Sequence, residues 1–184
     1  MAKQNRVTPT GTIEALPDRG LFTGNRGGAL HNEQHQIVKS YHDKRWLICD
    51  LEYKEVKAKV MAPGLYTHLF FLDEATALAA GHRPCYLCRF DAWKRFRDAW
   101  RSAHRVTGQL KTDDVDKVLH EERTSSPPRQ LSDIQKTHTC KAGTLPNGSF
   151  ILLDERPHLV WQRAAYPGAH QAMEPPQRYG RTTR

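Results

Sequence analysis

The order of apolar and polar residues predicts short strands and short helices along the chain. Residues 69–72 form an apolar run that is typical of a strand, and Asp73 then stands where a helix N-cap is expected. An alanine-rich segment follows and ends at Gly81, a residue type that favours the left-handed conformation that terminates helices. Apolar side chains at three- and four-residue spacing predict further helices over 91–105 and 112–122.

Apolar and aromatic runs between turn signals predict the remaining strands. Residues 1–30 contain several glycines and indicate short extended pieces joined by turns. Residues 45–61 predict a β-hairpin of the core, whose second strand covers 56–61. An Asn-Gly turn precedes a second predicted hairpin, which is formed by residues 149–153 and 159–161.

These elements predict an α+β fold in which β-hairpins pack on two or three helices. The chain has 184 residues, which is enough for one domain of ordinary size and a short appendage. We expect a small α+β domain over 1–122, a linker over 123–137, a β-hairpin appendage over 138–167 and a basic, flexible tail over 168–184.

The distribution of apolar residues indicates in which compartment the protein is found, and the compartment determines whether its cysteines are reduced. The longest nearly uncharged run, residues 60–72, is much shorter than the roughly 20 apolar residues needed to span a bilayer. Because the first ten residues contain no apolar stretch, we expect the protein to stay in the cytoplasm, with its cysteines reduced. Four reduced cysteines favour a metal site over disulfides.

The charge of the chain points to a polyanionic partner. Lysine and arginine number 28 against 20 acidic residues, a net charge of +8. Seven basic residues and only two acidic ones stand between positions 83 and 105. This excess is typical either of a solvated helix face or of a face that contacts phosphates. The candidate nucleic-acid contacts are Arg83, Arg89, Lys94, Arg97 and Arg101.

The pair Cys85 and Cys88 predicts a metal site. Two thiolates at this spacing can hold one tetrahedral Zn²⁺ at about 2.3 Å from each sulfur. Because no cluster of oxygen ligands stands nearby, zinc is preferred over magnesium or calcium. A redox dithiol has the same spacing, but it is expected at the start of a helix after a strand. Here the pair follows a glycine-terminated helix instead, which favours the metal.

The surroundings of this pair resemble a known family. Residues 70–75, Phe-Phe-Leu-Asp-Glu-Ala, and residues 79–89, Ala-Ala-Gly-His-Arg-Pro-Cys-Tyr-Leu-Cys-Arg, together resemble the second half of the N-terminal zinc-binding module of the Ada DNA-repair methyltransferase. In that family four cysteines hold zinc, and one of them accepts a methyl group from a DNA phosphotriester. The resemblance covers about residues 69–89 and implies that Cys85 and Cys88 are the second pair of ligands, with DNA as the partner.

The first pair of ligands is where this sequence departs from the family. Upstream stands only Cys49, at the end of a predicted strand, which we take as the third ligand against the alternative of a buried free thiol. The fourth ligand stays open, and its candidates are Cys140, His82, His68, His42 and His31. A fourth position left open to water would make the zinc catalytic instead of structural.

Ten histidines keep an enzymatic alternative open. His31 follows a glycine-rich segment, and His120 precedes two glutamates, although neither matches the spacing of a zinc protease. If the two converged on one cleft, they could serve a metal-dependent nuclease, and an exposed cysteine could serve a DNA-repair enzyme. We therefore expect a zinc protein that binds nucleic acid, DNA in preference to RNA. The alternatives are such an enzyme and a zinc-stabilised module for protein interaction.

Overall fold

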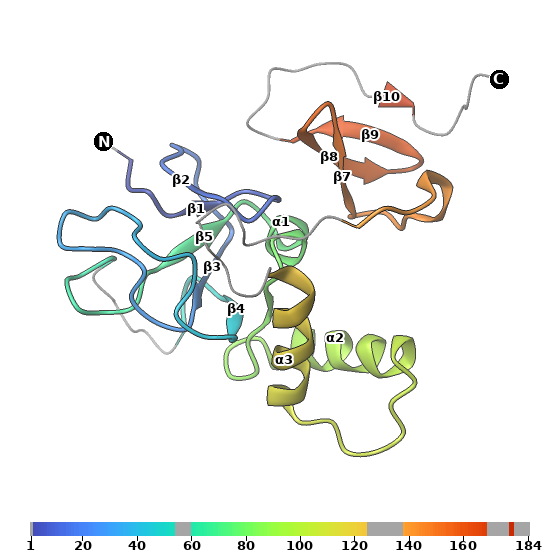
Figure 1. Ribbon diagram of the computed structural model, residues 1–184, viewed down its shortest axis with the longest axis horizontal. Helices are drawn as coiled ribbons and strands as arrows, with labels where there is room; N and C mark the ends of the chain where they lie inside the picture. Colours follow the sequence, from blue (N-terminus) through green and yellow to red (C-terminus); the bar gives the residue numbers. More distant parts are fainter. Residues whose placement is uncertain (1, 54–59, 125–137, 169–176, 179–184) are drawn as a thin grey trace. The chain divides into compact units, whose positions relative to one another are not determined.

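A computed structural model describes residues 2–53, 60–124, 138–168 and 177–178 (Figure 1). The chain divides into two compact units, Met1–Lys136 and Thr137–Arg184. The division falls within the predicted linker 123–137, of which residues 125–137 lie outside the described part. The described residues form an α+β protein, as the sequence predicts.

A six-stranded sheet forms the centre of the first unit. Its strands are β1 (Arg6–Val7), β2 (Ile13–Glu14), β3 (Phe22–Arg26), β4 (Trp46–Cys49), β5 (Leu69–Phe71) and β6 (Arg83–Pro84). Their order across the sheet is β2-β1-β5-β3-β4-β6. The pairs β1/β5 and β4/β6 are parallel, and the other neighbours are antiparallel. The parallel pair β4/β6 positions two of the candidate metal ligands, because Cys49 is the last residue of β4 and Cys85 directly follows β6.

The hydrophobic core packs against this sheet. It combines strand residues such as Ile48 and Phe71 with Ala77, which belongs to helix α1 (Glu74–Ala79), and all three side chains are fully buried. The other members of the cluster are Val7, Ile13, Leu30, Leu69 and Ala80. Small alanines on α1 allow the helix to lie close to the strands, which explains the alanine-rich composition of this segment.

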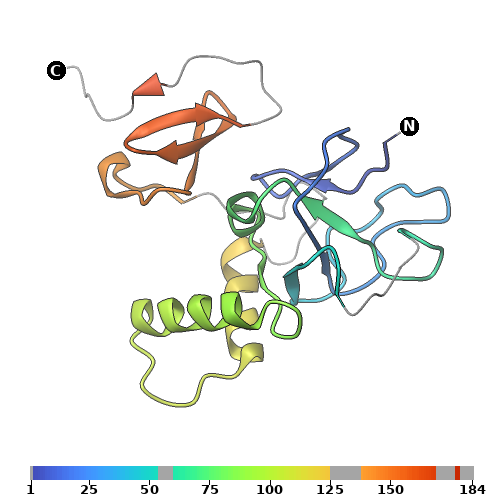
Figure 2. The ribbon, with the colours of Figure 1, turned by 180° about the vertical axis from the view of Figure 1, so that it is seen from behind.

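All three predicted helices are confirmed. The Asp73 side chain caps α1 by accepting a hydrogen bond of 2.7 Å from the Thr76 backbone N–H, and Gly81 has a φ of +79° after the helix end. The other two helices are α2 (Phe90–Ala103) and α3 (Thr112–Arg123). Figures 1 and 2 show both near the β4 end of the sheet, away from β2. None of the described helices is long and apolar enough to cross a membrane.

Replacing Asp73 by alanine is expected to lower the free energy of unfolding by about 1 kcal/mol, because the Thr76 N–H loses its partner. Asp73→Ser is the matched control, since a serine hydroxyl can accept the same hydrogen bond. Urea unfolding of the two variants checks this. Equal losses for alanine and serine would show that the cap contributes nothing.

The predicted hairpin over 45–61 is wrong in its pairing. Strand β4 pairs with β3 on one side, where Thr23 faces Cys49, and with β6 on the other, where Ile48 faces Pro84. Since both edges of β4 are occupied, no edge remains for a strand from the segment that follows it. Val60 and Met61 lie in a turn, and residues 54–59 lie outside the described part.

The second unit contains a four-stranded antiparallel sheet with a short 3₁₀ helix, Ala142–Thr144, before it. The strands are β7 (Phe150–Leu153), β8 (Arg156–Trp161), β9 (Ala164–Pro167) and β10 (Gln177–Arg178). The predicted hairpin is β7/β8, and β9 is a strand that the sequence did not predict. Within the tail predicted over 168–184, β10 pairs with β9, and the other residues beyond Gly168 lie outside the described part.

Candidate metal centre

The register of two parallel strands brings two cysteines together. Ile48 of β4 faces Pro84 of β6, and the Cys85 backbone N–H donates to the Ile48 carbonyl at 2.9 Å. Cys49 and Cys85 come directly after these facing residues, 36 positions apart in the sequence. Along β4 the side chains alternate, so that Trp46 and Ile48 enter the core while Cys49 lies on the half-buried face.

A tight turn then returns the chain to the same place. Residues 86–88 form the turn, and the Arg89 backbone N–H donates to the Cys85 carbonyl at 3.0 Å just before α2 begins. As a result, the sulfurs of Cys49, Cys85 and Cys88 all lie within 4.8 Å of one another. Ligand sulfurs of a tetrahedral zinc are about 3.8 Å apart when each Zn–S bond is about 2.3 Å. The three side chains could therefore hold a metal ion after small rotations.

Hydrogen bonds favour the anionic form that metal binding requires at one of the three sulfurs, that of Cys85. The Cys49 thiol donates to the Cys85 sulfur, and the backbone N–H groups of Leu87 and Cys88 point at the same sulfur. Together they lower the pKa of Cys85 to about 5, although burial opposes them. The hydrogen bond to Cys85 raises the pKa of Cys49, and burial raises that of Cys88. A divalent cation would offset the repulsion between three thiolates, so the donor set fits a thiophilic metal such as zinc.

Arg89 forms ion pairs with the residue after Cys49 and with the first residue of α1. Its guanidinium pairs with Asp50, the residue after Cys49, at 3.2 Å and with Glu74 of α1 at 2.9 Å. The same group lies 4.2 Å above the centre of the Phe22 ring. Because the Arg89 side chain is only 10% exposed among these contacts, it holds the centre in place and is poorly available to a phosphate.

Arg83, another predicted phosphate contact, is an internal residue. Its Nε and Nη2 atoms donate to the two carboxylate oxygens of Asp116 at 2.6 Å each, and its guanidinium lies 4.7 Å from the centre of the Trp93 ring. The side chains of Arg83 and Asp116 are 4% and 1% exposed. Arg83 therefore ties β6 to α2 and α3. Arg83 is poorly placed for the predicted phosphate contact, because a phosphate would have to displace Asp116.

The remaining basic candidates share one face of α2. Lys94, Arg97 and Arg101 follow one another at spacings of three and four residues, which places them in one stripe along the helix. Lys94 is exposed, while Arg97 and Arg101 are half-buried. Asp98 pairs with Arg97 at 2.9 Å. We call these three basic residues the α2 stripe.

Two histidine candidates for the fourth ligand have other surroundings. His82 is buried beside Phe71 and accepts a hydrogen bond of 3.2 Å from Arg26 Nε, and burial lowers its pKa well below the usual value. The ring of His42 lies against Gly28. Cys140 is exposed in the second unit. Within the described residues, no histidine, aspartate or glutamate joins the three cysteines as a further ligand.

The two candidate catalytic histidines contact different parts of the first unit. His31 Nδ1 lies 2.7 Å from the Thr67 hydroxyl oxygen, and the His31 ring stacks on that of His35. His120 packs edge-on against Tyr41, with 4.7 Å between the ring centres, and burial lowers its pKa. His68, the remaining ligand candidate, packs on Tyr66 near His31.

The sequence did not reveal the acidic partners of the centre. Asp50, Glu74 and Asp116 form ion pairs with the arginines that follow or precede the cysteines, yet only the neighbouring positions of Asp50 and Cys49 hint at such a role.

In comparisons with known proteins, no family profile, curated protein or solved structure matches the chain.

Proposed function

We propose that this protein binds zinc through Cys49, Cys85 and Cys88 and uses the adjoining helix to bind nucleic acid. The observation that carries the proposal is the approach of three sulfurs to within 4.8 Å, from strands and a turn that are far apart in sequence. Thiolate ligands favour zinc among the common divalent ions of cells. The resemblance of residues 69–89 to the Ada zinc module supports the same metal and favours DNA over RNA.

The position of the α2 stripe supports nucleic acid as the partner. The helix starts two residues after Cys88, so a metal held by the cysteines would fix the orientation of its first turn. Asp91 and Asp98 are the acidic residues of α2, and both lie beyond the same edge of the stripe. At about 100° per residue, they are rotated roughly 70–90° around the helix axis from the centre of the stripe. Asp98 nevertheless reaches Arg97 at the opposite edge and pairs with it at 2.9 Å, so the net positive charge of the stripe comes from Lys94 and Arg101. Such a row can follow a phosphate backbone without reading its sequence.

Replacing all three residues of the α2 stripe by glutamine is expected to weaken binding of a duplex DNA at low salt. The slope of log affinity against log salt should also fall by roughly 0.9 for each phosphate that the variant no longer contacts. Fluorescence anisotropy with a labelled duplex, measured over a range of salt concentrations, gives both quantities.

The matched control removes the same charge elsewhere on the first unit. Its three substitutions to glutamine are at exposed basic residues outside the stripe, Arg95, Arg105 and Lys117. This variant should retain most of the affinity and the salt slope. Equal effects in both variants would mean that DNA responds only to net charge, and wild-type binding that does not depend on salt would remove the nucleic-acid proposal.

A further inference from the structure

His31 is buried, and one of its ring nitrogens has no hydrogen-bond partner among the described residues. The Thr67 hydroxyl oxygen accepts a hydrogen bond of 2.7 Å from the Leu30 backbone N–H and lies 2.7 Å from His31 Nδ1. Thr67 is fully buried, and within the described residues its hydroxyl proton has no acceptor other than that nitrogen. His31 Nδ1 therefore accepts, and the ring proton sits on Nε2. This N–H is buried and has no hydrogen-bond partner within the described residues.

His68 adds a second donor of the same kind. The residue is 7% exposed, and both of its ring nitrogens are buried without a hydrogen-bond partner in the described part of the chain. At least one of the two carries a proton in every protonation state. The ring is held in place by Tyr66, with 4.3 Å between the ring centres. Leaving such groups unsatisfied costs about 1–3 kcal/mol each, so in solution each is expected to meet a water molecule or a bound ligand.

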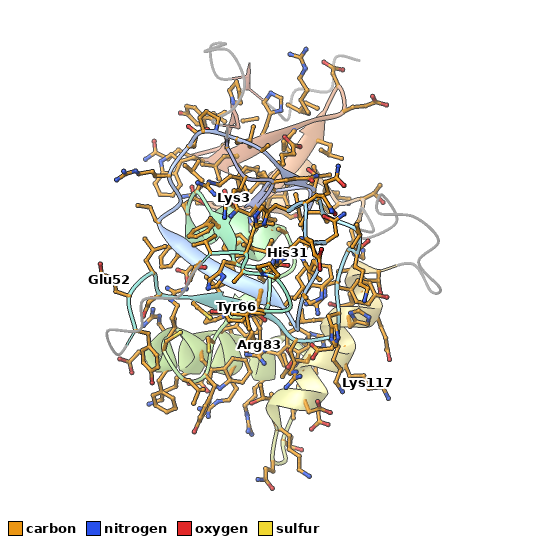
Figure 3. The ribbon with its side chains drawn as sticks, turned by 90° about the vertical axis from the view of Figure 1, so that its left-hand side faces the viewer. Lys3, His31, Glu52, Tyr66, Arg83 and Lys117 are labelled. Atoms are coloured by element: carbon orange, nitrogen blue, oxygen red, sulfur yellow. The ribbon has the colours of Figure 1, made fainter. Side chains whose placement is uncertain are left out.

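The charges around His68 are positive. Burial, the His31 ring and the Lys3 ammonium together lower the pKa of His68. Lys3 Nζ donates to the Val60 carbonyl at 2.9 Å, which leaves further ammonium protons for another acceptor. Lys3, His31 and Tyr66 follow one another down the middle of the face in Figure 3.

We propose that His31, His68 and Lys3 form a binding site for an oxyanion of the phosphate class. The three side chains supply N–H donors from the N-terminal segment, the loop after β3 and the residue before β5, and His31 and Lys3 both lie near enough to His68 to act on it electrostatically. A metal ion would meet protons on His31 Nε2 and the positive charge of Lys3, so a cation does not fit. The site lies outside the cysteine trio and the α2 stripe, and its existence does not depend on either of them.

Tyr66 covers His68, with 4.3 Å between the ring centres. Burial raises the pKa of the Tyr66 phenol, and Cys49 contributes to the same shift. The bound group is either a free phosphate or the phosphodiester of a nucleic acid, since both offer the same oxygens.

Titration of the full chain with inorganic phosphate, and separately with dimethyl phosphate, at constant ionic strength tests the proposal. The ring resonances of His31 and His68 should shift together in NMR spectra. Lys3→Met and His68→Phe should each weaken binding about tenfold. Binding of inorganic phosphate alone identifies a free phosphate as the ligand, and binding of dimethyl phosphate identifies a phosphodiester.

Lys117→Met and His104→Phe are the matched controls, because both residues are exposed on helices or helix ends away from these contacts. They should bind both probes as the unchanged protein does. The proposal is overturned if neither probe moves the His31 and His68 resonances. It is also overturned if Lys3→Met, a surface change that should not disturb folding, binds as tightly as Lys117→Met.

Discussion

Replacing Cys85 by serine is expected to lower the thermal unfolding temperature of the zinc-loaded chain by on the order of 10 °C or more. Structural zinc contributes about 10–16 kcal/mol of apparent binding free energy in small domains. Cys85 is one of three sulfurs at the centre and the one that receives hydrogen bonds from the Cys49 thiol and two backbone N–H groups. Its loss should therefore remove about a third of that energy, ~3–5 kcal/mol. Calorimetry in the presence of zinc measures the shift.

Cys140→Ser is the matched control, because this cysteine is exposed and belongs to the second unit. It should leave the unfolding temperature within a degree or two of the unchanged protein. Chelation of the metal should abolish the difference between Cys85→Ser and the unchanged protein. Equal unfolding temperatures for the two serine variants in zinc would contradict the proposed ligand.

Asp116→Asn is expected to destabilise the first unit by about 3–5 kcal/mol, because it leaves the Arg83 guanidinium charged, buried and without its partner. The Arg83–Asp116 pair joins β6 to α3 directly beside Cys85, so metal affinity should fall in the same variant. Urea unfolding measures the stability, and competition with a coloured chelator measures the zinc affinity.

Two variants separate this effect from a general loss of charge. Asp113→Asn on the same helix breaks only the exposed pair with Lys44 and should cost less than about 1 kcal/mol. The double substitution of Arg83 by methionine and Asp116 by leucine removes both charges and should be more stable than Asp116→Asn alone. A double variant as unstable as the single one would show that packing, not the unpaired charge, dominates.

The helices could be predicted because their signals are local. Asp73 and Gly81 lie at the two ends of α1, and both act through the backbone of the adjacent turn. The third strand of the second sheet, β9, was not predictable in this way. It follows a turn at Gln162 and Arg163 in which both residues have positive φ, a conformation that usually attracts glycine or asparagine.

The cysteine trio could be predicted only in part. The spacing of Cys85 and Cys88 is a local signal, whereas Cys49 depends on a parallel pairing between β4 and β6 that no nearby residue encodes. The predicted hairpin over 45–61 would have paired β4 with the segment that follows it, and not with β6. Cys49 was therefore predictable as a ligand only because it is a cysteine, and not because its position in the fold was known.

The basic residues show what a sequence cannot distinguish. Arg83 and Arg89 stand in the same cationic run as Lys94, but their carboxylate partners are distant in sequence. Asp116 follows Arg83 by 33 positions, and Glu74 belongs to a different helix. Net charge alone therefore predicts a class of partner, and burial decides which arginines could reach such a partner.

X-ray absorption at the zinc edge of the purified, reduced, full-length protein tests the metal centre most directly. We expect one zinc per chain, with sulfur neighbours at about 2.3 Å that diminish in number when Cys49 is replaced by serine. Zinc without sulfur neighbours, or reduced protein that retains no zinc, would contradict the centre formed by Cys49, Cys85 and Cys88.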